Sequence, residues 1–273
     1  MRRVIIVLFC AACGTGGDTS GPPQNAPVSG AGGFTKVMGD YVLLDSKPLT
    51  DPALYATSSS GPFAIWVTRG GTEIWRTDLA RIGTDPTPLR PALAATEPWE
   101  MGSVAKPSVE HDASGYHMAY EAAGNIIALA DSADGEVWTN KRMLGTGRAP
   151  SLASGFVFYE SMGEIWRAPA NATPALHIAT GTNPDVHVRQ TAGDRPIWQM
   201  YFNCTGRDLV SIAVCYGGSF DGENFSTTYI PILQPDLPDE EGPTGFVDNV
   251  GAILFFAQTP SGFMTRIAAA TAP

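Results

Sequence analysis

Charged residues and long apolar runs are both scarce in this sequence. Asp, Glu, Lys and Arg make up 16% of the chain, whereas hydrophobic residues make up 44%, beside 30 Gly and 22 Pro. No long window shows the apolar period and capping residues of a helix, and the Ala-rich pieces near Leu93 and Ala268 are short. This composition disfavours a helical fold and suits many short strands joined by turns.

Basic residues are outnumbered by acidic ones, 17 to 27, which gives a formal net charge of −10. A nucleic-acid partner is not expected, because phosphate binding needs a basic face. The sequence has no phosphate-binding loop, nucleophile elbow or dinucleotide fingerprint. We expect a monomer and no cofactor. We also expect no metal ion, since the four histidines lack metal-ligand spacing: His111, His117, His177 and His187.

The first twelve residues have the pattern of a secretory signal. Met1-Arg2-Arg3 is basic, and the apolar run Val4 to Phe9 is far too short to span a bilayer. Cys10-Ala11-Ala12-Cys13 resembles a bacterial lipobox, although the lipobox prefers Leu where this chain has Cys10. The pattern predicts that Cys13 is the lipidated first residue of the mature chain. An ordinary signal peptide cut near the same place is the alternative.

Residues 14–33 are rich in Gly, Pro and Ser and have almost nothing to bury, which is typical of a flexible tether. Residues 13–33 would then hold a folded domain, residues 34–273, away from the membrane. We therefore expect an exported protein of the cell envelope that is anchored to the membrane by acyl chains.

Only Cys204 and Cys215 remain once Cys10 and Cys13 are assigned to the leader. They flank a short segment and one strand, so they can meet across a hairpin, and export makes a disulfide chemically reasonable. Closing so short a loop would stabilise the fold by about 3 kcal/mol. A metal site or a reactive thiol is the weaker interpretation, because two sulfurs without nearby histidines are an incomplete ligand set.

The segment 106–138 predicts three antiparallel strands and a closing turn, the unit of a β-propeller blade. Its apolar alternation is interrupted by turn sequences at Asp112–Gly115, Ala123–Asn125 and Ser132–Gly135. Similar units begin near Asp51, Arg148, Asn183 and Gly242. Two of them share Glu-Ile-Trp-Arg, at residues 73–76 and 164–167, and two share Ser-x-Asp-Gly, at residues 132–135 and 219–222. The repeats predict an all-β fold, a five-bladed propeller, with a β-sandwich as the main alternative.

These motifs resemble those of the arabinanase, β-xylosidase and levansucrase group of glycoside hydrolases. The resemblance runs from about Asp51 to the end of the chain and rests on a Pro-Ser-Val opening, an acidic turn, a Tyr-rich middle strand and the closing Ser-x-Asp-Gly-x-x-Trp. It implies a five-bladed propeller that binds a carbohydrate and has three acidic residues at the mouth of its central channel. Two carboxylates are the minimum for glycoside cleavage.

The resemblance implies catalytic roles for Asp51, in an Asp-Pro opening, as base, and for Glu241, in a Glu-Gly-Pro opening, as acid. The second Asp-Pro opening of the family, which supplies a further carboxylate, is missing, because the remaining openings are Lys106-Pro107, Ala149-Pro150 and Asn183-Pro184. Asp185 lies two residues beyond Asn183, and strand alternation would place both side chains on the same side of the strand. Asp185 could therefore partly replace the missing carboxylate and support Asp51 and Glu241. A non-catalytic module that binds glycan or protein is the alternative function.

Three further residues are candidates for substrate binding. Lys106 and Asn183 occupy the non-acidic openings, and Lys106 could instead pair with an acid at the mouth. Trp99 is expected to lie in a loop and to stack on a sugar, whereas the other tryptophans occupy equivalent strand positions and are expected to pack the blades. Asp51 could simply end a strand, and Glu241 could belong to a solvated acidic loop.

Overall fold

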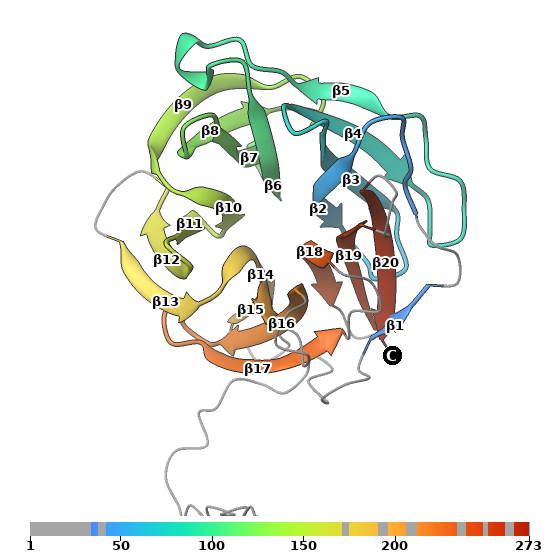
Figure 1. Cartoon of the computed structure of the whole chain (residues 1–273), viewed down its shortest axis with the longest axis vertical. Coiled ribbons are helices and arrows are strands. Elements are labelled where there is room, and N and C mark those ends of the chain that lie inside the picture. Colours follow the sequence, from blue (N-terminus) through green and yellow to red (C-terminus); the bar gives the residue numbers. More distant parts are fainter. Residues whose placement is uncertain are drawn as a thin grey trace, which may run out of the picture.

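The computed structural model describes residues 34–37, 42–170, 175–190, 196–205, 212–233, 239–247, 251–259 and 265–272. Within them, antiparallel sheets are arranged around a central channel as the five blades of a propeller (Figure 1). The predicted five-bladed propeller is confirmed, and the β-sandwich alternative is wrong. The predicted signal, lipidation site and tether, residues 1–33, lie outside the described residues. No helix in the described part of the chain is long and apolar enough to cross a membrane.

Each blade runs outward from an inner strand that lines the channel. Blade 1 contains β2 (Leu49–Ala56), β3 (Phe63–Arg69), β4 (Glu73–Leu79) and β5 (Arg90–Leu93). The 3₁₀ helix η1 (Pro98–Glu100) leads to blade 2, with β6 (Val104–Asp112), β7 (Gly115–Ala122), β8 (Ile126–Ser132) and β9 (Thr139–Thr146). Blade 3 contains β10 (Arg148–Ala153), β11 (Phe156–Ser161), β12 (Glu164–Pro169) and β13 (Leu176–Thr180). The predicted repeat units thus match blades, each with one further, outer strand.

Blades 4 and 5 share a single parallel backbone pairing, between Ile212 and Asp239. Blade 4 contains β14 (Thr182–Gln190), β15 (Pro196–Thr205), β16 (Ile212–Ser219) and β17 (Ser226–Leu233). Blade 5 contains β18 (Asp239–Val247), β19 (Ala252–Thr259), β20 (Arg266–Ala272) and, from the start of the fold, β1 (Thr35–Lys36). Because β1 pairs antiparallel with β20, backbone hydrogen bonds between the two ends of the fold close the ring.

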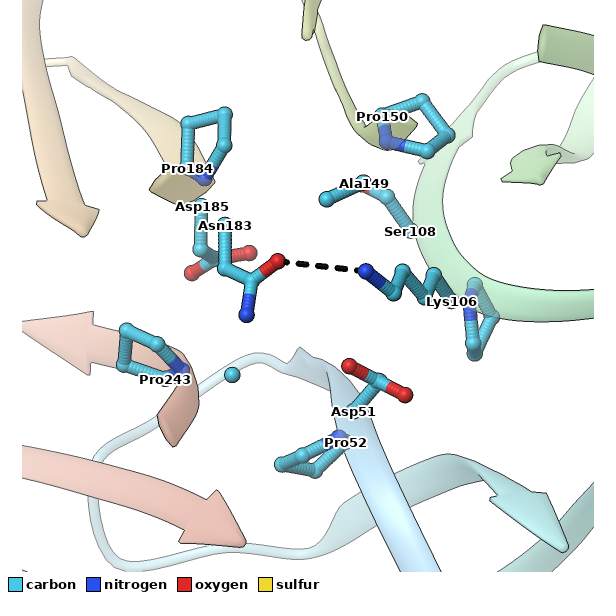
Figure 2. Close-up of a pocket in the computed structure, with 12 residues that line it drawn as sticks. Asp51, Pro52, Lys106, Ser108, Ala149, Pro150, Asn183, Pro184, Asp185 and Pro243 are labelled. Atoms are coloured by element: carbon cyan, nitrogen blue, oxygen red, sulfur yellow. Dashed lines mark hydrogen bonds between the residues drawn. The ribbon is translucent and has the colours of Figure 1, made fainter. Parts of the chain in front are cut away.

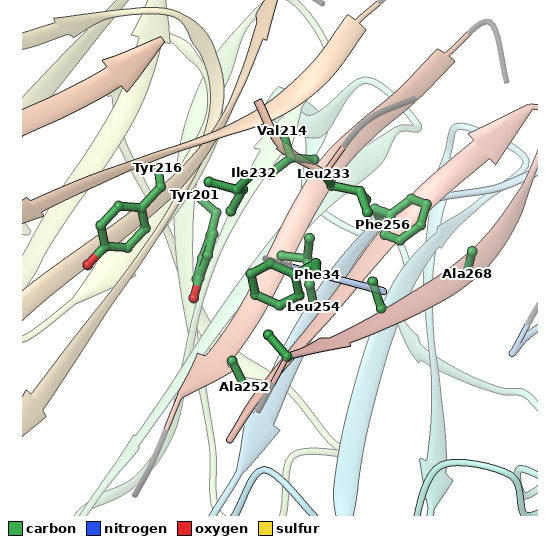
Figure 3. Packing of buried hydrophobic residues seen from close by; sticks show 12 residues of the cluster. Phe34, Tyr201, Val214, Tyr216, Ile232, Leu233, Ala252, Leu254, Phe256 and Ala268 are labelled. Carbon is green, nitrogen blue, oxygen red and sulfur yellow. The ribbon is translucent and has the colours of Figure 1, made fainter. Parts of the chain in front are cut away.

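The core lies between the blades rather than around the channel. Phe34, just before β1, packs edge-on to Tyr201 of blade 4 with ring centroids 6.4 Å apart, within a cluster shared by blades 4 and 5 (Figure 3). Phe63 of blade 1 meets Phe255 of blade 5 in the same way at 5.6 Å. Both faces of a blade are therefore buried against neighbours, which explains the nearly continuous apolar runs in β15 and β19.

The two repeated motifs of the sequence meet across blade boundaries. Arg76, in the first Glu-Ile-Trp-Arg, donates to the carbonyl of Asp134 at 2.9 Å, in the Ser-x-Asp-Gly turn of the next blade. Arg167, in the second, donates to Glu223 Oε1 at 2.9 Å, beside the other such turn. A β-carbon at Gly135 would lie 2.8 Å from the Arg76 guanidinium, so this turn needs glycine. The motifs recur because each forms half of an inter-blade contact.

The disulfide between Cys204 and Cys215 is present, as predicted. The two residues lie on neighbouring strands, β15 and β16, with their Cα atoms 5.8 Å apart. They are not directly opposed, because Cys204 pairs with Ala213 and Cys215 pairs with Phe202. The bond links the two middle strands of blade 4 diagonally.

We expect reduction of this disulfide to lower the free energy of unfolding by about 3 kcal/mol, because the unfolded chain loses a closed loop. Denaturant unfolding with and without reductant measures the effect. A Cys204→Ser/Cys215→Ser variant is the control, since its midpoint should not respond to reductant. An unchanged wild-type midpoint under conditions that free both thiols would contradict the prediction.

Candidate functional site

The five inner strands carry the same irregularity near their starts. One residue with left-handed backbone, φ between 45° and 60°, precedes a proline, and the strand register shifts there. Proline cannot donate to a strand ladder, and a bulge accommodates it. The five dipeptides line one pocket at the end of the channel, which we call the mouth: Asp51-Pro52, Lys106-Pro107, Ala149-Pro150, Asn183-Pro184 and Gly242-Pro243.

Three of these left-handed residues are tied to the preceding blade through their backbone N–H groups. Lys106 donates to Thr68 Oγ1 at 2.7 Å, and Ala149 donates to Glu121 Oε2 at 2.9 Å. Gly242 donates to Asn203 Oδ1 at 3.2 Å. The acceptor is in each case on the second strand of a blade, so the bulge both faces the mouth and joins two blades.

A second set of links lies two residues further along the inner strands. Leu152 N–H donates to Ser108 Oγ at 2.9 Å, and Val186 N–H donates to Ser151 Oγ at 2.7 Å. Gly245 N–H donates to Asp185 Oδ2 at 3.1 Å. Asp185 therefore occupies the same place in blade 4 as these serines in blades 2 and 3, and like them it accepts a hydrogen bond from a backbone N–H of the next blade.

Asp185 has a second partner that the serines lack. His187 Nε2 lies 2.5 Å from the same oxygen, Asp185 Oδ2, and the Asp185 side chain is 11% exposed. Burial lowers the pKa of His187, but the Asp185 carboxylate and the charge of Glu110 outweigh it and raise that pKa above its ordinary value. Asp185 thus lines the mouth as predicted, with one oxygen committed to an inter-blade bond and an ion pair.

Of the predicted catalytic residues whose side chains the structure describes, Asp51 is the one whose surroundings most resemble those of a catalytic carboxyl group. Its Oδ2 accepts a hydrogen bond from Thr50 Oγ1 at 2.7 Å. Burial raises the pKa of Asp51, and the negative charge of Glu121 adds to this, against the opposing effects of Lys106 and the threonine hydroxyls. Asp51 consequently holds its proton to a higher pH than an ordinary aspartate, which suits a proton donor better than the predicted base.

Lys106 and Asn183 are brought together at the mouth, as Figure 2 shows. Lys106 Nζ lies 3.4 Å from Asn183 Oδ1 and 3.7 Å from Glu121 Oε2. The acid that pairs with Lys106 is therefore Glu121, on the second strand of blade 2, which the sequence analysis did not single out. Its only signal in the sequence was an acidic residue at the end of the Tyr-rich strand.

The remaining two candidates are not seen at the mouth. Trp99 lies in η1, where it packs against the apolar cluster between blades 1 and 2, and it lines neither of the pockets described here. Glu241 belongs to β18, next to Gly242, but its side chain lies outside the described part of the structure. The left-handed position of blade 5 is occupied by Gly242, not by Glu241.

Two cavities open near these residues. The cavity on the channel axis has a volume of about 30 Å³, which is room for one or two water molecules. A larger one, of about 220 Å³, lies between blades 1 and 2 and shares Asp51 and Lys106 with the first. The mouth therefore presents hydroxyl, amide, carboxyl and ammonium groups around a small polar opening.

No family model matches the sequence, and no curated protein matches it either. Solved structures do match in fold. The GH43_1 enzyme of Xanthomonas citri is 12% identical, with 86% of this chain and 90% of that chain covered at a TM-score of 0.59. The α-L-arabinofuranosidase of Podospora anserina, in complex with cellotriose, is 12% identical, with 88% of this chain and 96% of that chain covered at a TM-score of 0.66. The GH62 α-L-arabinofuranosidase catalytic domain of Coprinopsis cinerea is 10% identical, with 88% of this chain and 96% of that chain covered at a TM-score of 0.65.

This likeness shows that the chain has the fold of five-bladed glycoside hydrolases. At 10 to 12% identity it assigns no activity to the mouth. Other structures of the Xanthomonas citri enzyme contain xylose or xylotriose. The predicted resemblance is confirmed for the fold, whereas the predicted roles of the site residues stay predictions.

The pairing of His187 with Asp185 predicts a pH dependence of stability. Because the folded pKa of His187 is raised, its contribution is fully present below the unfolded value of about 6.5 and is lost as the pH rises through the folded value. We expect the free energy of unfolding to fall as the pH rises above about 6.5 and through the folded pKa of His187, measured by denaturant titration.

Asp185→Asn should cost about 1.5 to 3 kcal/mol at pH 6, because a hydrogen bond to a charged group is lost, and should flatten this slope. His187→Gln should flatten it too. Equal slopes in the wild type and both variants would show that the pair does not control the pH dependence.

Proposed function

We propose that the channel mouth binds a neutral, pentose-containing polysaccharide. The observation that carries this proposal is the convergence of Asp51, Lys106 and Asn183 on one small opening at the end of the channel. Such mixed donors and acceptors suit the hydroxyl groups of a sugar. Binding of xylose and xylotriose by a protein of the same fold supports the choice of a pentose, and the cellotriose complex of another supports a carbohydrate ligand in general.

Binding, rather than hydrolysis, is the function that the described carboxylates favour. Asp185 and Glu121 both accept backbone N–H groups of the neighbouring blade, and Glu121 also lies near Lys106. Committed to structural hydrogen bonds, neither is well placed to exchange a proton with a substrate. Among the carboxyl groups that the structure describes at the mouth, Asp51 is then the one left for proton exchange, and glycoside cleavage needs two.

Hydrolysis is the second candidate, and the raised pKa of Asp51 favours it. A carboxyl with a raised pKa keeps its proton to a higher pH and is better able to donate it to the leaving oxygen, while Glu241, on the neighbouring inner strand, would activate water or attack the sugar carbon. The two roles are then reversed from those that the family resemblance implies.

We expect the wild-type domain to bind arabinoxylan or arabinan in calorimetry and to release no reducing sugar from either. Asp51→Asn should change the affinity less than tenfold, because the amide keeps the shape of the carboxyl group. Release of reducing sugar by the wild type, lost in both Asp51→Asn and Glu241→Gln, would instead support hydrolysis. A wild-type domain that binds neither polysaccharide would contradict the proposal.

We further propose that Cys13 carries acyl chains that anchor the protein to a membrane of the cell envelope. The disulfide supports export, because such bonds persist in oxidising compartments. Metabolic labelling with a fatty acid should mark the wild type and not Cys13→Ser. Unlabelled wild type, or equal label in the variant, would favour the ordinary signal peptide.

A further inference from the structure

We propose that the sugar ring bound by this protein sits off the channel axis, in the pocket between blades 1 and 2. This inference rests on the proposed carbohydrate function and assigns it a place. The pocket, which we call the inter-blade pocket, opens beside the mouth and is lined by Thr50, Asp51, Thr68, Gly71, Ser103, Ala105, Lys106, Glu121, Ala122, Ala123 and Gly124.

Size decides between the axis and the inter-blade pocket. The axial cavity, of about 30 Å³, has room for one or two water molecules and encloses far less of a sugar ring than the inter-blade pocket could. The inter-blade pocket, of about 220 Å³, is somewhat smaller than the roughly 300 to 1,000 Å³ of pockets for drug-sized ligands. Its volume suits one ring of a polysaccharide chain.

The inter-blade pocket is open because its walls are built from small residues. The turn between β3 and β4 contributes Gly71, where an added β-carbon would meet no atom within 4 Å. The turn between β7 and β8 contributes Ala123 and Gly124, and only the end of the Met101 side chain approaches Gly124, at 3.1 Å. These turns stand on adjacent blades and leave a gap that longer side chains would fill.

The polar groups of the inter-blade pocket match a neutral polyol. Glu121 and Lys106, 3.7 Å apart, offer an acceptor and a donor side by side, as neighbouring hydroxyl groups of a sugar require. Glu121 keeps unused lone pairs after accepting from Ala149, and the ammonium of Lys106 has three donors. The charge of Glu121 offsets that of the Lys106 ammonium, and Asp51 adds a second carboxyl group, so the pocket has no excess positive charge to attract an anionic sugar.

Filling the inter-blade pocket tests this placement. We expect Ala123→Trp to weaken binding of xylotriose, or of an arabinan trisaccharide, at least tenfold in calorimetry. Ser103→Trp, beside Ala123 and just before the neighbouring strand of blade 2, should do the same. A second variant guards against the misfolding of either one, which thermal unfolding checks. The matched control is Met162→Trp, in the corresponding turn of blade 3, where the side chain is fully exposed; its affinity should equal that of the wild type.

The outcomes separate the placement from the proposed function. A folded Ala123→Trp and a folded Ser103→Trp that both bind like the wild type would overturn the placement while leaving carbohydrate binding intact. Loss of binding in Asn183→Trp, which fills the axis, with both wall variants unaffected would assign the ligand to the axis. A wild type that binds neither trisaccharide nor the polysaccharides would overturn the function and the placement together.

Discussion

The bulge at the start of each inner strand is the constraint on which the rest of this structure depends. A left-handed residue is costly for all but glycine, and four of the five positions are not glycine. The conformation persists because the following proline is relieved of ladder hydrogen bonds and, in three blades, the residue's own N–H bonds to the neighbouring blade. The bulge therefore both directs the side chains of the mouth and joins neighbouring blades.

The junction between blades 5 and 1 is built differently. The residue of blade 5 that corresponds to Thr68 is Ala257, which has no side-chain acceptor. The residue that corresponds to Asp185 is Thr244, and its hydroxyl has no hydrogen-bond partner among the described residues. Apolar packing replaces these links, with Phe63 against Phe255, and the β1–β20 pairing closes the ring beside it. Asp51 thus lies at a junction that lacks both of these side-chain links among the described residues. It is next to Gly242, where a β-carbon would approach Asp51 Oδ1 to 3.3 Å.

Charge at the mouth is nearly balanced, because its carboxylates lie beside basic side chains. Glu121 and Asp185 each serve a backbone amide and a basic side chain, so their charges are largely spent inside the protein. Asp51, whose pKa is raised by burial, is the carboxyl most easily kept neutral. The protein can therefore present many hydrogen-bonding groups to a sugar without a strong field of either sign.

The sequence by itself determined the number of blades, the turns between strands, the disulfide and the five openings, because each of these depends on neighbours in the chain. Strand alternation, turn residues and two cysteines eleven positions apart are local signals. It could not assign Asp185 to the inter-blade link it shares with Ser108 and Ser151, nor find Glu121 beside Lys106. Nor could it show that Trp99, in η1, is partly buried against the cluster between blades 1 and 2. Those positions were decided by contacts between blades, which join residues tens of positions apart, and only the closed ring brings such residues within hydrogen-bonding distance.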